Sequence, residues 1–252
     1  MGDRRSARIR DPLRLTAQVV GELLLTVGAI ALLFVVWQVG WSTLVSAQSQ
    51  RAAVDSFSQR FPGPFITSAQ DSKSFGDPVV APAPTQDGTV FGVVYIPRFG
   101  PDYEPRPVVQ GTGQQELDTL GLGHYVSGAM PGEVGNFSLA GHRQTHGATL
   151  DAIHTLVPGD KIYVQTATGY FTYIYRNNAI VLPTQSNVLA PVPMEPHLQA
   201  DERYLTLTSC NPRFGQSERF IAFAVMDSWR PISAGPPKEI AEQVQTAMGG
   251  GK

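Results

Sequence analysis

Hydrophobic and polar positions divide the chain into three zones. Residues 23–41 form an apolar run, LLLTVGAIALLFVVWQVGW, without a charged side chain and with only Thr26 and Gln38 clearly polar. Residues 61–88 contain five prolines separated mainly by small and polar residues. From Thr89 onward, short apolar runs alternate with turn-forming residues. This order predicts an apolar helix, an extended linker and then one folded domain.

The folded zone is predicted to be mainly β. Six segments have strand length and are rich in β-branched and aromatic residues. They are Val90–Ile96, Asn136–His142, Lys161–Thr166, Tyr170–Val181, Tyr204–Cys210 and Arg219–Met226. Thr168-Gly169 separates two of these segments and predicts a hairpin. Because only Gln114–Leu120 and Thr149–Leu156 are predicted as helices, a closed barrel or a sandwich is expected.

The N-terminal apolar run is long enough to cross a membrane. A bilayer core of about 30 Å needs about 20 helical residues, and this run has 19. Five arginines precede it within the first 14 residues, against two acids. Two arginines lie in the 19 residues that follow it. The excess of arginine before the span predicts that the N-terminus is cytoplasmic and the folded domain is outside.

A cleaved signal peptide is the alternative for this segment. Signal peptides have an apolar region of about 7–15 residues, which is shorter than this run. The sequence Val45-Ser46-Ala47-Gln48 is a weak match to a cleavage site. We therefore expect an anchored protein with five parts. They are a basic cytoplasmic segment (1–22), a transmembrane helix (23–41), an extracytoplasmic stalk (42–88), a folded β domain (89–228) and a flexible C-terminal tail (229–252).

Composition narrows the classes of function. The net charge is −2 and the sequence pI is about 6.2, so the chain lacks the excess of basic residues that is typical of a nucleic-acid-binding protein. Among its 252 residues there is one cysteine, so no disulfide can form within the chain. A single cysteine in an extracytoplasmic domain is a free thiol with potential chemistry.

Strand alternation gives that cysteine a definite face. In Tyr204–Cys210, Leu205, Leu207 and Ser209 share one face, and the leucines are expected to point into the core. Cys210 falls on the opposite, more polar face with Thr208, at the end of the strand. A buried, inert cysteine is the usual alternative, and this alternation argues against it.

His142 and Arg219 are the predicted partners of Cys210. His142 ends a predicted strand on the face opposite Phe137 and Leu139, and Arg219 begins the strand that follows Cys210 after an eight-residue loop. A thiolate can attack a carbonyl, a histidine can transfer the protons, and an arginine can stabilise the oxyanion. The three residue types together therefore predict covalent acyl transfer.

These residues also carry a family resemblance. Thr206-Leu207-Thr208-Ser209-Cys210 resembles the sortase signature Thr-Leu-x-Thr-Cys, with serine in place of the second threonine. Leu139-Ala140-Gly141-His142 is similar to the catalytic-histidine strand of sortases, and the order His, Cys, Arg agrees. The phrases YIPRFG, GHYVSGAMPGEVGNFSLAGHRQTHG and TLTSCNPRFGQSERFIAFAV resemble class E sortases of actinobacteria.

The resemblance implies an eight-stranded sortase-type β-barrel with short helices. It implies a transpeptidase that cleaves a Leu-Ala-x-Thr-Gly or Leu-Pro-x-Thr-Gly signal between Thr and Gly. The intermediate would be a Cys210 thioester, resolved by the peptide-stem amine of a lipid-linked cell-wall precursor. His142, Cys210 and Arg219 would be catalytic, and Tyr125, Ala140 and Thr208 would bind the signal. No cofactor is implied, and with no acidic cluster that suggests calcium, we expect no metal.

Other functions fit parts of this pattern. A hydrolytic cysteine peptidase would use the same nucleophile but pass the acyl group to water. An L,D-transpeptidase would place histidine and glycine immediately before the cysteine, where Thr208-Ser209 stand instead. A non-enzymatic, membrane-anchored β domain with an inert thiol is the remaining alternative.

Overall fold

The structure is a computed structural model that describes residues 12–64 and 75–250. It contains two compact units, Met1–Trp41 and Ser42–Lys252. Helix α1 (Pro12–Arg60) contributes its first part to the first unit and Ser42–Arg60 to the second.

The first unit is the apolar part of α1. Leu13–Trp37 is a 25-residue stretch that contains an 18-residue window with a mean hydropathy of 2.5, and it is long and apolar enough to cross a membrane. Its large apolar side chains are exposed, for example Leu25 at 75% and Leu32 at 66%. The apolar stretch therefore begins ten residues before the predicted start at Leu23.

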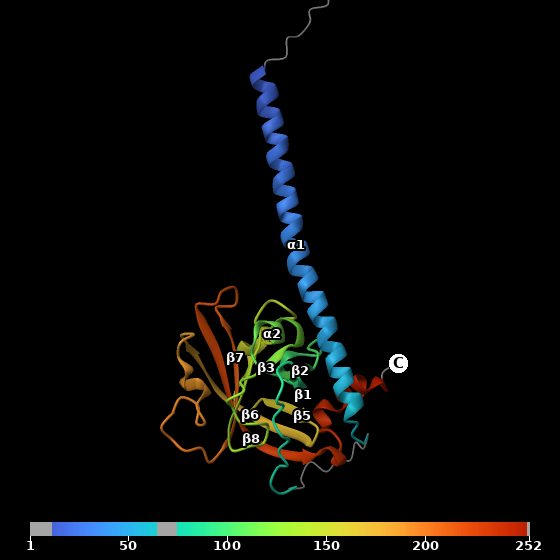
Figure 1. Cartoon of the computed structure of the whole chain (residues 1–252), viewed down its shortest axis with the longest axis vertical. Helices are drawn as coiled ribbons and strands as arrows, with labels where there is room; N and C mark the ends of the chain where they lie inside the picture. The colour runs from blue at the N-terminus through green and yellow to red at the C-terminus, as the bar shows by residue number, and fades with distance from the viewer. Residues whose placement is uncertain (1–11, 65–74, 251–252) are drawn as a thin grey trace, which may run out of the picture. The chain divides into compact units, whose positions relative to one another are not determined.

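The second unit is built on a closed eight-stranded barrel (Figure 1). Around the barrel the strand order is β1-β2-β3-β4-β7-β8-β6-β5, and β5 pairs with β1 to close it. The strands are β1 (Val90–Tyr95), β2 (Arg106–Gln110), β3 (Leu122–His124), β4 (Gly135–Ala140), β5 (Lys161–Thr166), β6 (Gly169–Val181), β7 (Arg203–Asn211) and β8 (Glu218–Pro231). The β2–β3 and β4–β7 pairs are parallel, and the other pairs are antiparallel.

Helices around the barrel are short. The α-helices are α2 (Gln114–Leu120) and α3 (Ala241–Gln245). The 3₁₀ helices are η1 (Pro97–Phe99), η2 (Asp151–Thr155), η3 (Ser186–Leu189), η4 (Ile232–Ala234) and η5 (Lys238–Ile240), and η6 (Thr246–Gly250) is a π turn. The predicted helix at Gln114–Leu120 is confirmed, and the one at Thr149–Leu156 is the shorter 3₁₀ helix η2.

The barrel interior is the main hydrophobic core. It includes Leu205 and Leu207 of β7, both fully buried, as their predicted face requires. From β8, Phe220, Ala222 and Ala224 enter the same core. The alternate residues of these two strands therefore face outward, and among them are Cys210 and Arg219.

A second apolar cluster lies between the barrel and the C-terminal part of α1. Val54 and Phe57 of α1 are each 4% exposed and pack in one cluster with Val93, Tyr95 and Tyr163. Ser46, Gln50 and Ser58 are buried as well, so one face of Ser42–Arg60 is covered. The first part of the predicted stalk is therefore a helix packed on the domain.

The rest of the predicted stalk has no regular structure where it is described. Phe75 packs against the main core, and Trp229 Nε1 donates to the Gly76 carbonyl at 2.8 Å. The remainder of the stalk, residues 65–74, lies outside the described residues.

The C-terminal segment differs from the expected flexible tail. β8 continues to Pro231, and α3 follows a short connection. Ile240 and Val244 are fully buried in the cluster that contains Val54 and Phe57. These apolar residues are spaced four apart, which lets a short helix present them to one surface. Residues 251–252 lie outside the described residues.

Candidate active site

The parallel pairing of β4 with β7 determines where His142 lies. Ala140 is paired with Thr208 at the end of β4. Beyond the strand, Gly141 N donates to the Thr208 carbonyl at 3.0 Å, and Ser209 Oγ donates to the Gly141 carbonyl at 2.9 Å. The backbone therefore continues alongside β7, so that His142 follows Gly141 just as Cys210 follows Ser209.

His142 lies two residues beyond β4 rather than at its end, contrary to the prediction that it closes the strand. Gly141 occupies the turn because an added Cβ would lie 2.7 Å from both Leu122 Cδ2 and Thr149 Oγ1. The His142 carbonyl accepts a hydrogen bond from Leu150 N at 2.9 Å. This contact closes the loop that follows β4 and holds the backbone at His142.

Cys210 and Arg219 face each other across the β7–β8 hairpin. They are direct partners in the antiparallel register, so their side chains leave the sheet on the same side. Cys210 is a half-buried free cysteine. Arg219 Nη1 donates to the carbonyls of Gln216 and Glu218, each at 2.9 Å. The predicted closeness of the two residues at one rim thus agrees with the geometry.

Asp118 is a neighbour of His142 that the sequence did not predict. Its Oδ1 lies 2.7 Å from His142 Nε2 and 3.4 Å from His146 Nδ1. Asp118 comes from α2, whose carbonyl at this residue accepts a hydrogen bond from Ser46 Oγ at 2.7 Å. The aspartate precedes His142 by 24 residues in a short polar helix, so no spacing rule could connect them.

Arg143 is the second unpredicted residue. It is 6% exposed, and its Nη1 donates to the Cys210 carbonyl at 3.2 Å and to Asn211 Oδ1 at 3.1 Å. Its guanidinium lies over the Phe220 ring, 5.5 Å from the centroid. Burial lowers the pKa of Arg143 from its ordinary value. A largely buried cation is thus attached to the backbone of the predicted nucleophile.

The three predicted substrate-binding residues lie together. Ala140 and Thr208 are register partners, and the Tyr125 hydroxyl lies 3.0 Å from Thr208 Oγ1. Thr208 shares the face of Cys210, two residues before it. Ile221, the β8 partner of Thr208, packs on this outer face in a small apolar cluster with Val181 and Val188. The nucleophile is therefore flanked by a small polar network and an apolar cluster.

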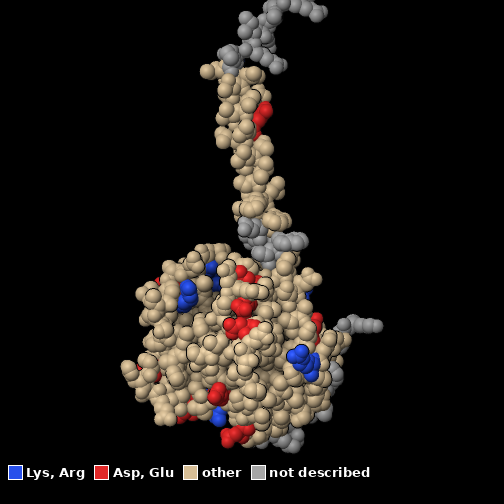
Figure 2. Space-filling model, in the orientation of Figure 1, with Lys and Arg blue, Asp and Glu red and all other residues tan. Residues whose placement is uncertain are grey.

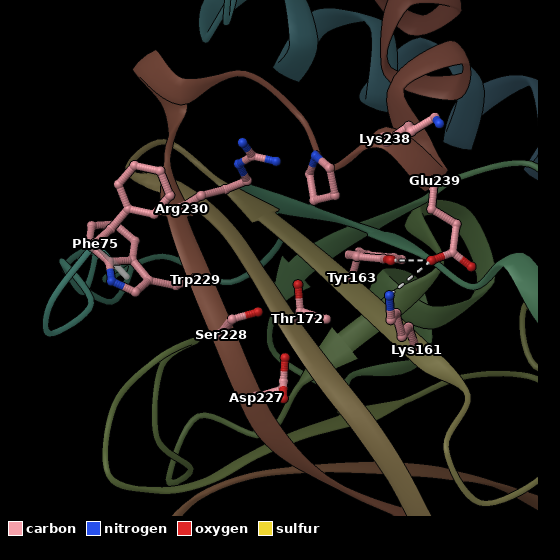
Figure 3. A pocket seen from close by; sticks show the side chains of 11 residues that line it. Phe75, Lys161, Tyr163, Thr172, Asp227, Ser228, Trp229, Arg230, Lys238 and Glu239 are labelled. Atoms are coloured by element: carbon pink, nitrogen blue, oxygen red, sulfur yellow. Dashed lines mark hydrogen bonds and ion pairs between the residues drawn. The ribbon is translucent and has the colours of Figure 1, made fainter. Parts of the chain in front are cut away.

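A cavity of about 520 Å³ lies elsewhere on the domain (Figure 3). It is lined by the last residues of β8, by β5 and β6, and by the segment before α3. In it Tyr163 donates a hydrogen bond to Glu239, and Lys161 Nζ lies 3.5 Å from Glu239 Oε2. None of the predicted site residues lines this cavity, so volume alone does not identify the reactive site.

Comparison with known proteins identifies the family. The sortase domain matches residues 94–227 of this chain. The chain belongs to the sortase family. Sortase SrtE1 of Streptomyces coelicolor is 34% identical over 247 residues, which cover 93% of this chain and 64% of that protein. The chain thus spans slightly less than two thirds of the length of this curated relative.

Solved sortases place the chain with class E. Sortase E from Streptomyces avermitilis is 39% identical with a TM-score of 0.55, covering 62% of this chain and 99% of that chain. Sortase E1 from Streptomyces coelicolor, solved with a tripeptide in the active site, is 36% identical with a TM-score of 0.56, covering 61% and 97%. Sortases are cysteine transpeptidases, and this sortase has one cysteine, Cys210. The predicted sortase-type eight-stranded barrel is confirmed.

Proposed function

We propose that this sortase is a membrane-anchored transpeptidase that cleaves a C-terminal sorting signal of secreted proteins and joins them to a cell-wall precursor amine. The observation that carries the proposal is the pairing of Cys210 with Arg219, with His142 following β4 alongside Cys210. The proposal takes its nucleophile, proton carrier and oxyanion donor from three adjacent segments of the sheet, which supports a shared site. The catalytic work is assigned to residues 89–228.

In the first half-reaction, the Cys210 thiolate attacks the threonine carbonyl of a Leu-Ala-x-Thr-Gly or Leu-Pro-x-Thr-Gly signal. Arg219 donates hydrogen bonds to the resulting oxyanion. When the intermediate collapses, the C–N bond breaks and the glycine nitrogen takes a proton from His142. The products are a thioester on Cys210 and the released C-terminal peptide.

In the second half-reaction, a peptide-stem amine attacks the thioester carbonyl. The amine loses a proton to His142 as the new amide forms, and the C–S bond breaks to restore the thiolate. Because His142 Nε2 is hydrogen-bonded to the Asp118 carboxylate, Nδ1 is the nitrogen that remains for these transfers. Asp118 thereby acts as a positioning residue that sets the orientation of the imidazole.

Features beside Cys210 support binding of an extended peptide. Tyr125, Ala140 and Thr208 form a surface of small and polar groups on the face of the nucleophile. The neighbouring apolar cluster around Ile221 offers a partner for the leucine of the signal. Arg219 has five N–H donors, and its contacts with the carbonyls of Gln216 and Glu218 use only those on Nη1. The other N–H groups can therefore donate to an oxyanion.

We assign the apolar part of α1 as the membrane anchor, with the N-terminus cytoplasmic and the catalytic domain extracellular. The support is the length and hydropathy of Leu13–Trp37 and the excess of arginine before it. This placement would bring the nucleophile to the compartment that holds secreted proteins and cell-wall precursors. The face of the catalytic domain shown in Figure 2 carries scattered acidic and basic side chains without an extended basic surface.

The test is a product analysis with a sorting-signal peptide and an amine such as triglycine. The full chain in detergent micelles is expected to cleave the peptide after threonine and to form the amide with triglycine. Formation of the free acid alone would instead indicate a hydrolytic cysteine peptidase. No cleavage of either type of signal, at any amine concentration, would contradict the proposal.

A further inference from the structure

Asp118, His142 and His146 form a compact cluster of potential metal ligands. One ligand atom from each residue can be chosen so that all three lie within 4.8 Å of one another. The shortest separations are those of Asp118 Oδ1 from His142 Nε2, 2.7 Å, and from His146 Nδ1, 3.4 Å. The two imidazole rings are tilted by 37° with centroids 5.0 Å apart. We call these three residues the His–Asp cluster.

His146 is directed into the cluster by its own backbone contacts. Its φ of 51° lies in the left-handed region, and its carbonyl accepts a hydrogen bond from Gln50 Nε2 at 3.0 Å. Gln50 is in turn held by Arg106, whose Nη1 donates to Gln50 Oε1 at 2.7 Å. Yet the buried Nδ1 of His146 has no hydrogen-bond partner among the described residues, although it lies close to the carboxylate.

This donor set suits a divalent transition metal. Two imidazoles and one carboxylate are the protein ligands of zinc sites that keep an open coordination position. With metal–ligand bonds of about 2.0–2.2 Å, tetrahedral ligand atoms are about 3.3–3.6 Å apart, so only small side-chain movements are needed. The three side chains are 22–30% exposed, which leaves a route for the ion and room for water. Imidazole donors disfavour calcium and magnesium.

We propose that the His–Asp cluster binds a divalent transition metal, with Zn²⁺ as the representative ion, and that the bound ion inhibits this sortase. The inhibition part rests on the proposed function, in which His142 carries the protons. Zn²⁺ on His142 Nε2 would replace its hydrogen bond to Asp118 and fix the imidazole in the neutral form with its proton on Nδ1. That imidazole can no longer accept a proton from the attacking amine.

The binding test must separate this cluster from the thiol, because Cys210 can also ligate zinc. Co²⁺, whose visible spectrum reports nitrogen and oxygen ligation, is titrated into the full Cys210→Ala chain in detergent micelles. Binding is expected to survive in this background. His146→Asn, added to it, is expected to weaken Co²⁺ affinity by at least ~10-fold, since outer-shell changes alone reach that size. Asparagine tolerates the left-handed backbone of His146, and its amide oxygen, although it can reach the position of Nδ1, is a weaker ligand for a transition metal than an imidazole nitrogen.

His154→Ala is the matched control, because it removes a histidine that lies in η2 outside the cluster. The Co²⁺ affinity of this variant is expected to stay within about twofold of that of the Cys210→Ala chain, a difference of only about 0.4 kcal/mol. Asp118→Asn serves as a second cluster variant, and thermal melts verify that each variant is folded. Failure of the Cys210→Ala chain to bind Co²⁺ below 1 mM, or unchanged affinity after both cluster substitutions, would overturn the site.

The inhibition test uses chains that retain Cys210. For each chain, the Zn²⁺ concentration that halves its own transpeptidation rate is measured. His146→Asn is expected to raise that Zn²⁺ concentration by at least ~10-fold relative to wild type. His154→Ala is expected to leave the concentration unchanged. Equal sensitivity of His146→Asn and wild type would overturn the regulatory claim. A wild-type chain without turnover would count against the proposed function, and the cobalt measurements would still decide the metal site.

Discussion

At the scale of single residues, the reactive side chains are held by backbone contacts more than by contacts with one another. Cys210 is placed by its β8 partner and by the Arg143 hydrogen bond to its carbonyl. His142 is placed by the chain after β4 and by Asp118. A site on such supports keeps its geometry when one reactive side chain is replaced, so substitutions should report on chemistry rather than on folding.

The first prediction concerns Arg219. If it donates to the oxyanion, Arg219→Ala should lower the transpeptidation rate by ~10²–10³, the effect of losing one oxyanion donor. Arg219→Lys should rescue poorly because an ammonium lacks the planar fork. Arg213→Ala is the control, since Arg213 lies in the β7–β8 loop that precedes Arg219 but pairs with Asp151 at 2.6 Å. An activity loss that only follows a lowered melting temperature would make Arg219 structural.

The second prediction separates His142 from its neighbour. His142→Ala should abolish acyl transfer, whereas His146→Ala should keep most of it, because His142 follows the strand that pairs with the nucleophile strand. Single-turnover rates of the two variants with one signal peptide make the comparison. Near-normal turnover by His142→Ala would remove it from the mechanism. A complete loss in His146→Ala, with a normal melt, would transfer the role to His146.

Part of the site was predictable at this scale. Alternation along Tyr204–Cys210 is enough to separate the core leucines from the cysteine. Hairpin geometry is enough to bring Arg219 near it. Asp118 and Arg143 were not predictable, because their contacts depend on how α2 and the loop after β4 pack. No local pattern in the sequence encodes those long-range approaches.

At the scale of elements, the long strands were predicted and the short ones were not. β5, β6, β7 and β8 are rich in aromatic and β-branched residues, and their predicted bounds lie within one residue of those observed, except that β8 runs five residues beyond the predicted end at Met226. β2 contains a proline and β3 has three residues with a central glycine, so neither has a strand pattern of its own. Both form because the barrel supplies neighbours on each side.

The third prediction concerns the C-terminal part of α1, which the sequence alone suggested as a stalk. Phe57 is 4% exposed and its ring lies 5.0 Å from that of Phe61. Phe57→Ala should lower the free energy of unfolding by about 3–5 kcal/mol, the usual cost of removing a buried phenylalanine. Urea denaturation of the full chain in micelles measures it.

Phe214→Ala is the control for that measurement. Phe214 is 85% exposed in the β7–β8 loop, so its removal should change the unfolding free energy by less than about 0.5 kcal/mol. If Phe57→Ala has an equally small effect, the helix segment does not stabilise the catalytic domain in solution.

At the scale of the whole molecule, the chain combines an apolar segment with a catalytic barrel of the sortase family. Each part was predictable from sequence for a different reason. The apolar segment follows from hydropathy alone, whereas the identity of the barrel required the resemblance around His142 and Cys210. The segment after Trp229 is rich in Pro and Gly, so the sequence predicted a flexible tail. In the structure two of its apolar residues, Ile240 and Val244, are buried.

The fourth prediction concerns topology. Protease added to intact protoplasts should remove the domain from about Thr89 onward, because the arginines before the span favour a cytoplasmic N-terminus. An epitope at the N-terminus should stay protected until the membrane is permeabilised. Full protection of the barrel in intact protoplasts would contradict the assigned orientation.

Formation of a thioester between Cys210 and the threonine of a sorting signal is the step that defines the proposed transpeptidase. The most direct measurement is the intact mass of the full chain after brief incubation with a signal peptide and no added amine. The expected result is an added mass equal to that of the peptide through threonine less one water, mapped to Cys210, released by hydroxylamine and absent in Cys210→Ala. Peptide cleavage without this adduct, or an equal adduct on the Cys210→Ala chain, would contradict it.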